Sequence, residues 1–165
     1  MISLEQLLES RDARAAHQQE LLAAHPSASL VCLTVQLPGP EKRNALSLTI
    51  GQAGLEALRE RFPASHYEVR DLETGYEVYM LVREGALEAK RMCCELEESH
   101  PLGRLMDMDV LGAEGPVSRS RLGLPERCCL LCGQPVRYCM RAKNHSREEL
   151  LLRIKQMVEE YEKRM

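Results

Sequence analysis

The segment GRLMDMDVL, residues 103–111, places two aspartates two positions apart in an otherwise apolar run. Such a run predicts a β-strand, in which residues two apart point to the same face. Asp107 and Asp109 would then stand side by side, with Met106 and Met108 on the opposite face. Neighbouring carboxylates repel each other and are unfavourable to bury unless a cation lies between them. The pair therefore predicts a divalent metal site, and Mg²⁺ is the ion that carboxylates hold in phosphoryl and nucleotidyl transfer.

A second interpretation is that the pair lies on a solvated edge strand and has no role, because two aspartates at this spacing also arise by chance.

The residues that follow favour a polyanionic substrate. From Val117 to Arg147 the only acid is Glu126, and the basic residues are Arg119, Arg121, Arg127, Arg137, Arg141, Lys143 and Arg147. Guanidinium groups suit phosphate oxygens. These arginines could equally decorate a loop and pair with acids elsewhere.

Cysteines and one histidine follow in the same region, with the spacing Cys129-x2-Cys132-x6-Cys139-x5-His145. Three thiolates and an imidazole in a short loop are typical ligands of a structural zinc ion. Cys128 leaves open which thiol would bind. The alternatives are a set of reduced, partly buried thiols, or a nucleophilic thiol (Cys132 or Cys139) paired with His145.

Composition narrows the class of protein. The chain has 165 residues, a formal net charge of −3, no Trp and one Phe, which argues against a general nucleic-acid-binding protein. No apolar run is long enough to cross a membrane. The N-terminus, MISLEQLLES, has no basic region before an apolar core and so does not resemble a signal peptide. We therefore expect a cytoplasmic protein whose seven cysteines are thiols or metal ligands rather than disulfides.

Hydrophobic periodicity predicts helices alternating with strands, and hence an α/β or α+β fold. We expect one domain over residues 1–165, with a mixed sheet flanked by helices. Helices are expected at 4–24, around 55–62, at 84–99 and, with amphipathic character, at 147–164; strands are expected at 29–37, 66–73, 75–82 and 103–112, with 115–122 pairing to the last. Ser3 with Gln6 and Ser146 with Glu149 form predicted capping boxes. A Cys/Arg-rich segment occupies residues 125–145.

Two segments, HPLGRLMDMDVLG and VSRSRLGLPERCCLLCGQPVRYCMRAKNHSREEL, resemble the citrate lyase holo-acyl-carrier-protein synthase family, that is, apo-citrate lyase phosphoribosyl-dephospho-CoA transferase. The resemblance extends more weakly to ISLEQLLESRDARAAHQQELL and to the LPGPEKRN turn. It implies that triphosphoribosyl-dephospho-CoA is the donor and a serine of the acyl-carrier subunit of citrate lyase is the acceptor. Pyrophosphate would leave, and neither nucleic acid nor a membrane would take part.

The resemblance also implies roles for individual residues. Asp107 and Asp109 would bind Mg²⁺, and one of them would help to deprotonate the serine. Contacts to the triphosphate would come from Arg104 and Arg119, and further contacts to phosphate or carrier from Lys42, Arg14 and Arg11. A nucleotidyltransferase-like fold is expected, although Gly103-Arg104 replaces the Gly-Ser or Gly-Gly step that usually precedes the acidic pair. That fold also needs a third carboxylate on another strand. Asp71 is the first candidate for it, and Glu77 is the second.

Two alternatives stay open on the sequence alone. The same prosthetic group could be transferred to another carrier, such as that of malonate decarboxylase. Otherwise the chain could be a non-enzymatic interaction protein, stabilised by zinc at Cys129, Cys132, Cys139 and His145, with the two aspartates merely solvated.

Overall fold

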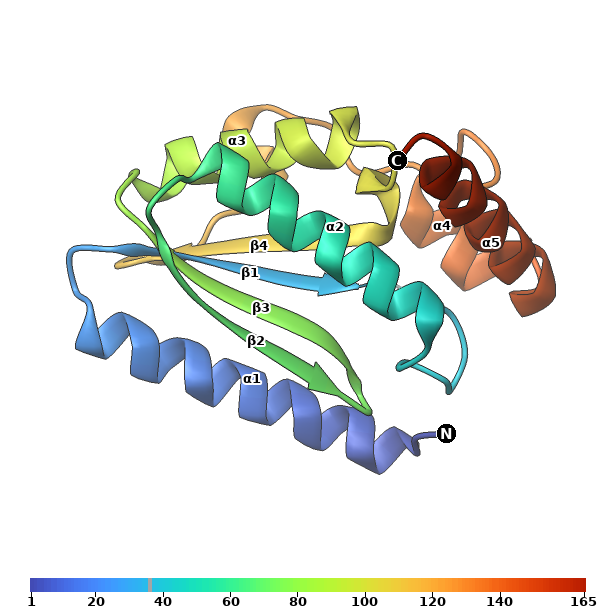
Figure 1. Cartoon of the computed structure of the whole chain (residues 1–165), viewed down its shortest axis with the longest axis horizontal. Coiled ribbons are helices and arrows are strands. Elements are labelled where there is room, and N and C mark those ends of the chain that lie inside the picture. The colour runs from blue at the N-terminus through green and yellow to red at the C-terminus, as the bar shows by residue number, and fades with distance from the viewer. Residues whose placement is uncertain (36) are drawn as a thin grey trace.

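The computed structural model describes residues 1–35 and 37–165, and its helices and strands follow one another along the chain as Figure 1 shows. The elements are α1 (Leu4–Ala24), β1 (Ser29–Val35), α2 (Ala45–Arg61), β2 (His66–Leu72), β3 (Gly75–Val82), α3 (Ala86–Ser99), the 3₁₀ helix η1 (Gly103–Leu105), β4 (Met106–Gly112), β5 (Gly115–Pro116), the 3₁₀ helix η2 (Arg119–Leu122), α4 (Val136–Ala142) and α5 (Arg147–Lys163). Gln36, which the sequence placed in the first strand, lies outside the described residues. Among the described helices, none is long and apolar enough to span a membrane.

The strands form a five-stranded sheet in the order β2-β3-β1-β4-β5. Each neighbouring pair is antiparallel. The α+β class is confirmed, but the expected mixed sheet is wrong. The strands β1 and β2 do run in the same direction across the α2 connection, yet β3 folds back between them, so they never become neighbours.

Alternating residues of the sheet face two different layers. Val31 and Leu33 of β1 lie in the main core beneath α2, α3 and α5, whereas Leu30 and Cys32 point to the opposite face. That opposite face carries α1, whose Leu21 and Leu22 pack beside Leu30. No residue of α1 is fully buried, so this helix covers its face of the sheet only in part. The aspartates of β4 belong to the face covered by α1.

The starts of α1 and α5 agree with the sequence, but α2 begins at Ala45, ten residues before the helix expected around 55–62. Strand lengths also differ, since β1 ends at Val35 rather than extending to residue 37. Both predicted capping boxes are present, at Ser3 and at Ser146. The strand expected at 103–112 begins only at Met106, because Gly103–Leu105 form a 3₁₀ turn. A Cβ on Gly103 would lie 2.2 Å from the carbonyl oxygen of Glu97, so only glycine lets the chain pass this close to the end of α3. The partner strand β5 is short, at Gly115–Pro116.

Candidate active site and cysteine–histidine cluster

The strand geometry of the aspartate pair is as the sequence predicted. Met106 and Met108 are fully buried in the main core, and Asp107 and Asp109 point to the other face of β4. Asp107 stands opposite Thr34 of β1, and Asp109 stands opposite Cys32. The two carboxylates therefore occupy successive positions on one face of the sheet, which is the arrangement that a shared cation requires.

A third carboxylate on this face belongs to Glu77, not to Asp71. Thr34 pairs with Glu77 on its other side, so Asp107, Thr34 and Glu77 form one row across three strands. Glu77 is buried, accepts a 2.7 Å hydrogen bond from the Tyr79 hydroxyl and lies 3.0 Å from the guanidinium of Arg14 on α1. Asp71 pairs with Tyr76, which packs into the opposite core, so the first choice made from sequence is wrong. Register explains this, because neighbouring residues of a strand face opposite sides.

Electrostatics at the aspartates favour a cation. Burial, then the negative charges of Asp109 and Glu97, raise the pKa of Asp107 from 3.8 to about 6, although Arg127 and Lys90 act in the opposite direction. Desolvation by the surrounding protein also raises the pKa of Asp109, although this side chain keeps access to solvent. A bound divalent ion would stabilise both carboxylates in their charged form and so lower these pKa values.

We expect the metal-free protein to lose stability as the pH rises through about 6, because the folded state holds the proton of Asp107 more tightly than the unfolded chain, whose ordinary pKa is 3.8. The stability that this bound proton contributes is fully present below the unfolded pKa of 3.8 and is lost above the folded pKa of about 6. Urea unfolding in chelator, at pH values on both sides of this range, should show a steeper decline for wild type than for Asp107→Asn. Every group other than residue 107 is the same in the two proteins, so the difference between the curves isolates Asp107. Parallel curves for the two proteins would contradict the raised pKa.

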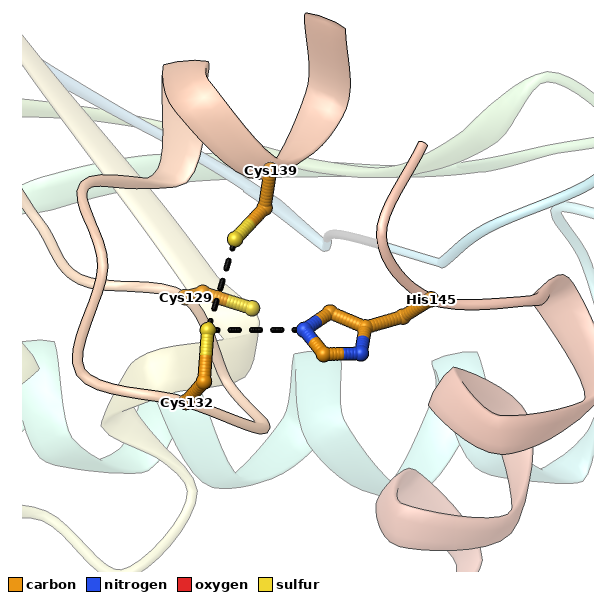
Figure 2. A group of neighbouring side chains, drawn as sticks. All are labelled: Cys129, Cys132, Cys139 and His145. Atoms are coloured by element: carbon orange, nitrogen blue, oxygen red, sulfur yellow. Dashed lines mark hydrogen bonds between the residues drawn. The ribbon is translucent and has the colours of Figure 1, made fainter. Parts of the chain in front are cut away.

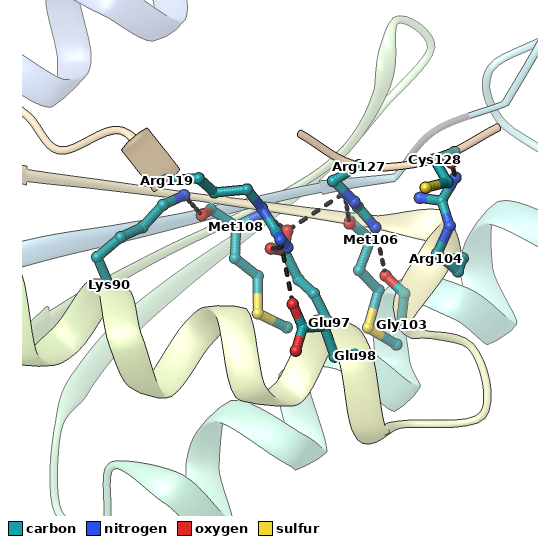
Figure 3. A network of polar contacts seen from close by, with 10 residues as sticks. All are labelled: Lys90, Glu97, Glu98, Gly103, Arg104, Met106, Met108, Arg119, Arg127 and Cys128. Atoms are coloured by element: carbon teal, nitrogen blue, oxygen red, sulfur yellow. Dashed lines mark hydrogen bonds and ion pairs between the residues drawn. The ribbon is translucent and has the colours of Figure 1, made fainter. Parts of the chain in front are cut away.

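The outer edge of β4 pairs with β5 only at Leu111 and Gly112, and nearer its start, at residues 106–108, charged side chains complete this edge (Figure 3). The N–H of Met108 donates to Glu97 Oε2 at 2.9 Å, and Lys90 Nζ donates to the Met108 carbonyl at 2.9 Å. Arg127 donates to the carbonyl oxygens of Met106 and Gly103 at 2.7 and 2.8 Å. Unpaired strand edges need such partners when they are buried. This network, from α3 and residue 127, holds the strand that carries both aspartates.

At the centre of the network is Glu97, a carboxylate that is only 2% exposed. It forms ion pairs with Arg119 at 2.7 Å and Arg127 at 3.3 Å, and Arg119 also reaches Glu98 at 3.2 Å. Arg119, expected from the resemblance to bind phosphate, therefore lies against the acids of α3, outside the cleft described below. Glu97 follows Ala89 and Cys93 on one helical stripe, and an acid on an apolar stripe is the sequence signal that could have revealed it.

A cleft of about 1070 Å³ opens beside Asp107. Its walls come from the turn after β1, from η1 and β4, and from the segment leading into α5. Asp107 and Glu149 are the carboxylates among the described residues that line it. The cationic lining is larger and comprises Arg11, Lys42, Arg104, Arg127 and Lys143. The cleft therefore brings together Arg11, Lys42, Arg104 and Asp107, four of the residues expected to act together, whereas Arg14 faces Glu77 instead.

The cations of the cleft repel one another. Burial, then the neighbouring Arg11 and Arg147, lower the pKa of Lys42 below its ordinary value. Burial and Arg127 likewise lower the pKa of Arg104, which donates a hydrogen bond to the carbonyl oxygen of Cys128. Like charges gathered in a partly buried cleft favour a polyanionic ligand, because the ligand relieves their mutual repulsion. Lys143 and Arg127 were not singled out from the sequence, since both lay within a longer basic run.

The cysteines and the histidine of the predicted zinc site meet in space (Figure 2). The ligand atoms of Cys129, Cys132, Cys139 and His145 all lie within 4.8 Å of one another, so the cluster could hold a metal ion. Burial raises the pKa of Cys129, but the backbone N–H groups of Leu131 and Cys132 donate to its sulfur and bring the pKa below its ordinary value. Cys128 is exposed and does not belong to the cluster, which resolves the ambiguity between the adjacent thiols.

Comparison with known proteins shows the family to which this chain belongs. The profile of the family described as "Apo-citrate lyase phosphoribosyl-dephospho-CoA transferase" matches residues 2–161. The "Probable apo-citrate lyase phosphoribosyl-dephospho-CoA transferase" of Vibrio cholerae is 37% identical over 97% of this chain and 93% of its own length. The protein of Citrobacter koseri with the same name, without "Probable", is 38% identical over 95% of this chain and 88% of its own. "Protein CitXG" of Haemophilus influenzae is 36% identical over 98% of this chain but only 36% of its own length. The chain belongs to the family of apo-citrate lyase phosphoribosyl-dephospho-CoA transferases.

Proposed function

We propose that this protein transfers a phosphoribosyl-dephospho-CoA group to the acyl-carrier subunit of apo-citrate lyase. The proposal is supported by the names of its relatives, which describe them as phosphoribosyl-dephospho-CoA transferases of apo-citrate lyase. The observation that supports the proposal most directly is the cleft, in which Asp107 meets Arg11, Lys42, Arg104 and Lys143. A carboxylate that can hold a metal thus stands beside the cations that a chain of phosphates needs.

The donor that we propose is triphosphoribosyl-dephospho-CoA. Its triphosphate would lie along Lys42, Arg104 and Lys143, because these cations have no carboxylate partner among the ion pairs of the described residues. The cleft also has apolar walls, formed by Leu37, Leu105, Leu130, Val136, Met140 and Leu150. Those walls suit the less polar nucleoside and pantetheine parts of the donor.

The aspartates fit a divalent cation, since they share one face of β4, and burial and the nearby charge of Glu97 raise the pKa of both. Asp107 and Asp109 would hold Mg²⁺, which when bound neutralises phosphate charge and makes the attacking hydroxyl more acidic. Zinc is the metal that we infer for the cysteine–histidine cluster, in a structural role, and it takes no part in the transfer. Mg²⁺ prefers oxygen ligands and zinc prefers thiolate and imidazole, so the two sites would not compete.

The reaction that we propose is a phosphodiester transfer of the nucleotidyltransferase class. The carrier serine oxygen forms a bond to the phosphorus nearest the ribose, and the bond from that phosphorus to the pyrophosphate oxygen breaks. The serine proton passes to a carboxylate oxygen of the aspartate pair and then to solvent. Lys42 and Arg104 stabilise the negative charge that develops on the leaving pyrophosphate. The acceptor and donor are the partners, and neither nucleic acid nor membrane takes part; reduced thiols fit a cytoplasmic protein.

The proposed function is tested by the intact mass of the apo carrier subunit after incubation with this protein, the donor and Mg²⁺. We expect a mass gain equal to phosphoribosyl-dephospho-CoA, together with release of pyrophosphate. Chelator should abolish the gain, and so should a carrier in which the acceptor serine is changed to alanine. The carrier of malonate decarboxylase, run in parallel, should gain mass more slowly. No gain on either carrier from folded protein would contradict the proposal and favour the interaction-protein alternative.

A further inference from the structure

We propose that Cys129, Cys132, Cys139 and His145 bind a single zinc ion, and that this ion fixes the wall of the cleft formed by residues 123–146. The first half stands on the cluster alone. The second half rests on the proposed function, because it assigns that wall to the triphosphate of the donor.

The two distances from Cys132 Sγ to its neighbours are close to those of a tetrahedral metal site, and all four ligand atoms lie within 4.8 Å of one another. Zinc bonds of about 2.3 Å to sulfur and 2.0 Å to nitrogen place sulfurs about 3.8 Å apart and sulfur about 3.5 Å from nitrogen. Cys132 Sγ lies 3.4 Å from Cys139 Sγ and 3.4 Å from His145 Nε2 (Figure 2). Three thiolates and one imidazole complete four-coordination and leave no open position, which is the pattern of a structural zinc ion rather than a catalytic one.

The backbone around Cys129 is also shaped for a metal. Residues Cys128 and Pro135 form an isolated antiparallel bridge, and Cys129 N–H donates to the Gln134 carbonyl at 2.7 Å. The loop between them turns back so that the N–H groups of Leu131 and Cys132 donate to Cys129 Sγ. Such bonds to a ligand sulfur stabilise the thiolate form that binds zinc.

Residues 123–146 have almost no apolar core of their own. The only buried side chains in this stretch are Cys129 and Cys139, and its one helix, α4, has just seven residues. Leu130 packs partly against the main core, while Tyr138 and Met140 of α4 are 56% and 72% exposed. Arg127 anchors the start of this segment to Glu97 and to the carbonyl oxygens of Met106 and Gly103. The rest of the segment buries little besides its potential ligands, so a metal ion would supply much of the free energy that orders it.

This segment supplies one whole side of the cleft. Lys143 lies between the ligands Cys139 and His145 in sequence, and it lines the cleft together with Val136 and Met140. Lys143 has a left-handed backbone conformation, with φ of 50°, where α4 ends. Because ligands precede and follow it closely, metal binding would hold this strained residue in place and direct its ammonium group to the cleft.

The first experiment is the metal content of the purified protein, with Cys132→Ser as the test and Cys128→Ser as the matched control. Cys128 is the adjacent exposed thiol outside the cluster. We expect one zinc per chain in wild type and in Cys128→Ser, and loss of zinc in Cys132→Ser. Replacement of zinc by Co²⁺ should give the intense visible absorption of tetrahedral thiolate coordination. The proposed site would be wrong if reduced wild-type protein supplied with zinc did not hold one zinc per chain. It would also be wrong if Cys132→Ser kept its zinc while Cys128→Ser lost it.

The second experiment asks whether zinc orders the cleft wall. Trypsin should cut the zinc-free protein after Arg137, Arg141 and Lys143 but spare the zinc-bound form, while circular dichroism shows that the sheet persists. Inorganic triphosphate, as a probe of the cleft, should bind the zinc-free protein about tenfold more weakly, because one charge-assisted contact is lost. If the zinc-free and zinc-bound forms resisted trypsin equally, or bound triphosphate with equal affinity, zinc would not be what fixes this wall of the cleft. If zinc-bound protein binds no triphosphate, the proposed donor fails, whereas zinc content and trypsin resistance still decide the metal site.

Discussion

Asp107→Asn and Asp109→Asn are each expected to lower the rate of transfer to the carrier by about a thousandfold or more, because in the proposed reaction each removes a charge that would hold Mg²⁺ at the reacting phosphate. Both side chains leave the same face of β4, and Asp107 also lines the cationic cleft. The amide keeps the shape and removes the charge, so the loss should appear in kcat rather than in donor binding. The measurement is the initial rate of carrier mass gain at saturating donor.

The same substitutions should not destabilise the protein. Burial raises the pKa of both aspartates, and the charge of Asp109 further raises that of Asp107, so an uncharged amide at either position removes a buried or repelling charge from the metal-free state. Glu114, an exposed acid in the turn between β4 and β5, supplies the matched control: Glu114→Gln should keep full activity. If folded Asp107→Asn transferred the group at the wild-type rate, the carboxylates would have no part in the chemistry, and the assignment of Mg²⁺ to them would be wrong.

Glu97→Ala is expected to lower the free energy of unfolding by roughly 3–5 kcal/mol, the usual effect of removing one partner from a buried ion pair. Its carboxylate is the shared partner of Arg119 and Arg127 and the acceptor for the Met108 N–H. Alanine would leave both guanidinium groups and one backbone donor without this acceptor inside the protein. Urea unfolding, analysed for its midpoint and slope, measures the change.

Glu98→Ala is the matched control for this prediction. Glu98 is the next residue of α3 and also contacts Arg119, at 3.2 Å, but its side chain is 60% exposed. Its removal should change the free energy of unfolding by at most about 1 kcal/mol, as for other exposed ion pairs. Equal effects at both positions would show that the network does not depend on the buried carboxylate. An intermediate effect is expected for Glu97→Gln, because the amide oxygen can still accept from Met108.

Local sequence patterns determined the elements and the chemistry that they carry. Alternation along residues 106–110 placed Asp107 and Asp109 on one face, and the capping boxes at Ser3 and Ser146 marked the starts of α1 and α5. The spacing of the cysteines and His145 predicted a cluster that the structure does form. These predictions were accurate because side-chain direction in a strand, helix caps and short loops depend on residues close together in the chain.

Tertiary structure alone decided which distant groups meet these elements. Strand order and register placed Glu77, and not Asp71, in the row with Asp107. Packing of α3 against the outer edge of β4 placed Arg119 against Glu97, outside the lining of the cleft. The cleft joins Arg11 and Lys42 from the first part of the chain to Lys143 near its end. Periodicity within one element tells which face a residue occupies, but its partners follow from how whole elements pack, and no local pattern contains that information.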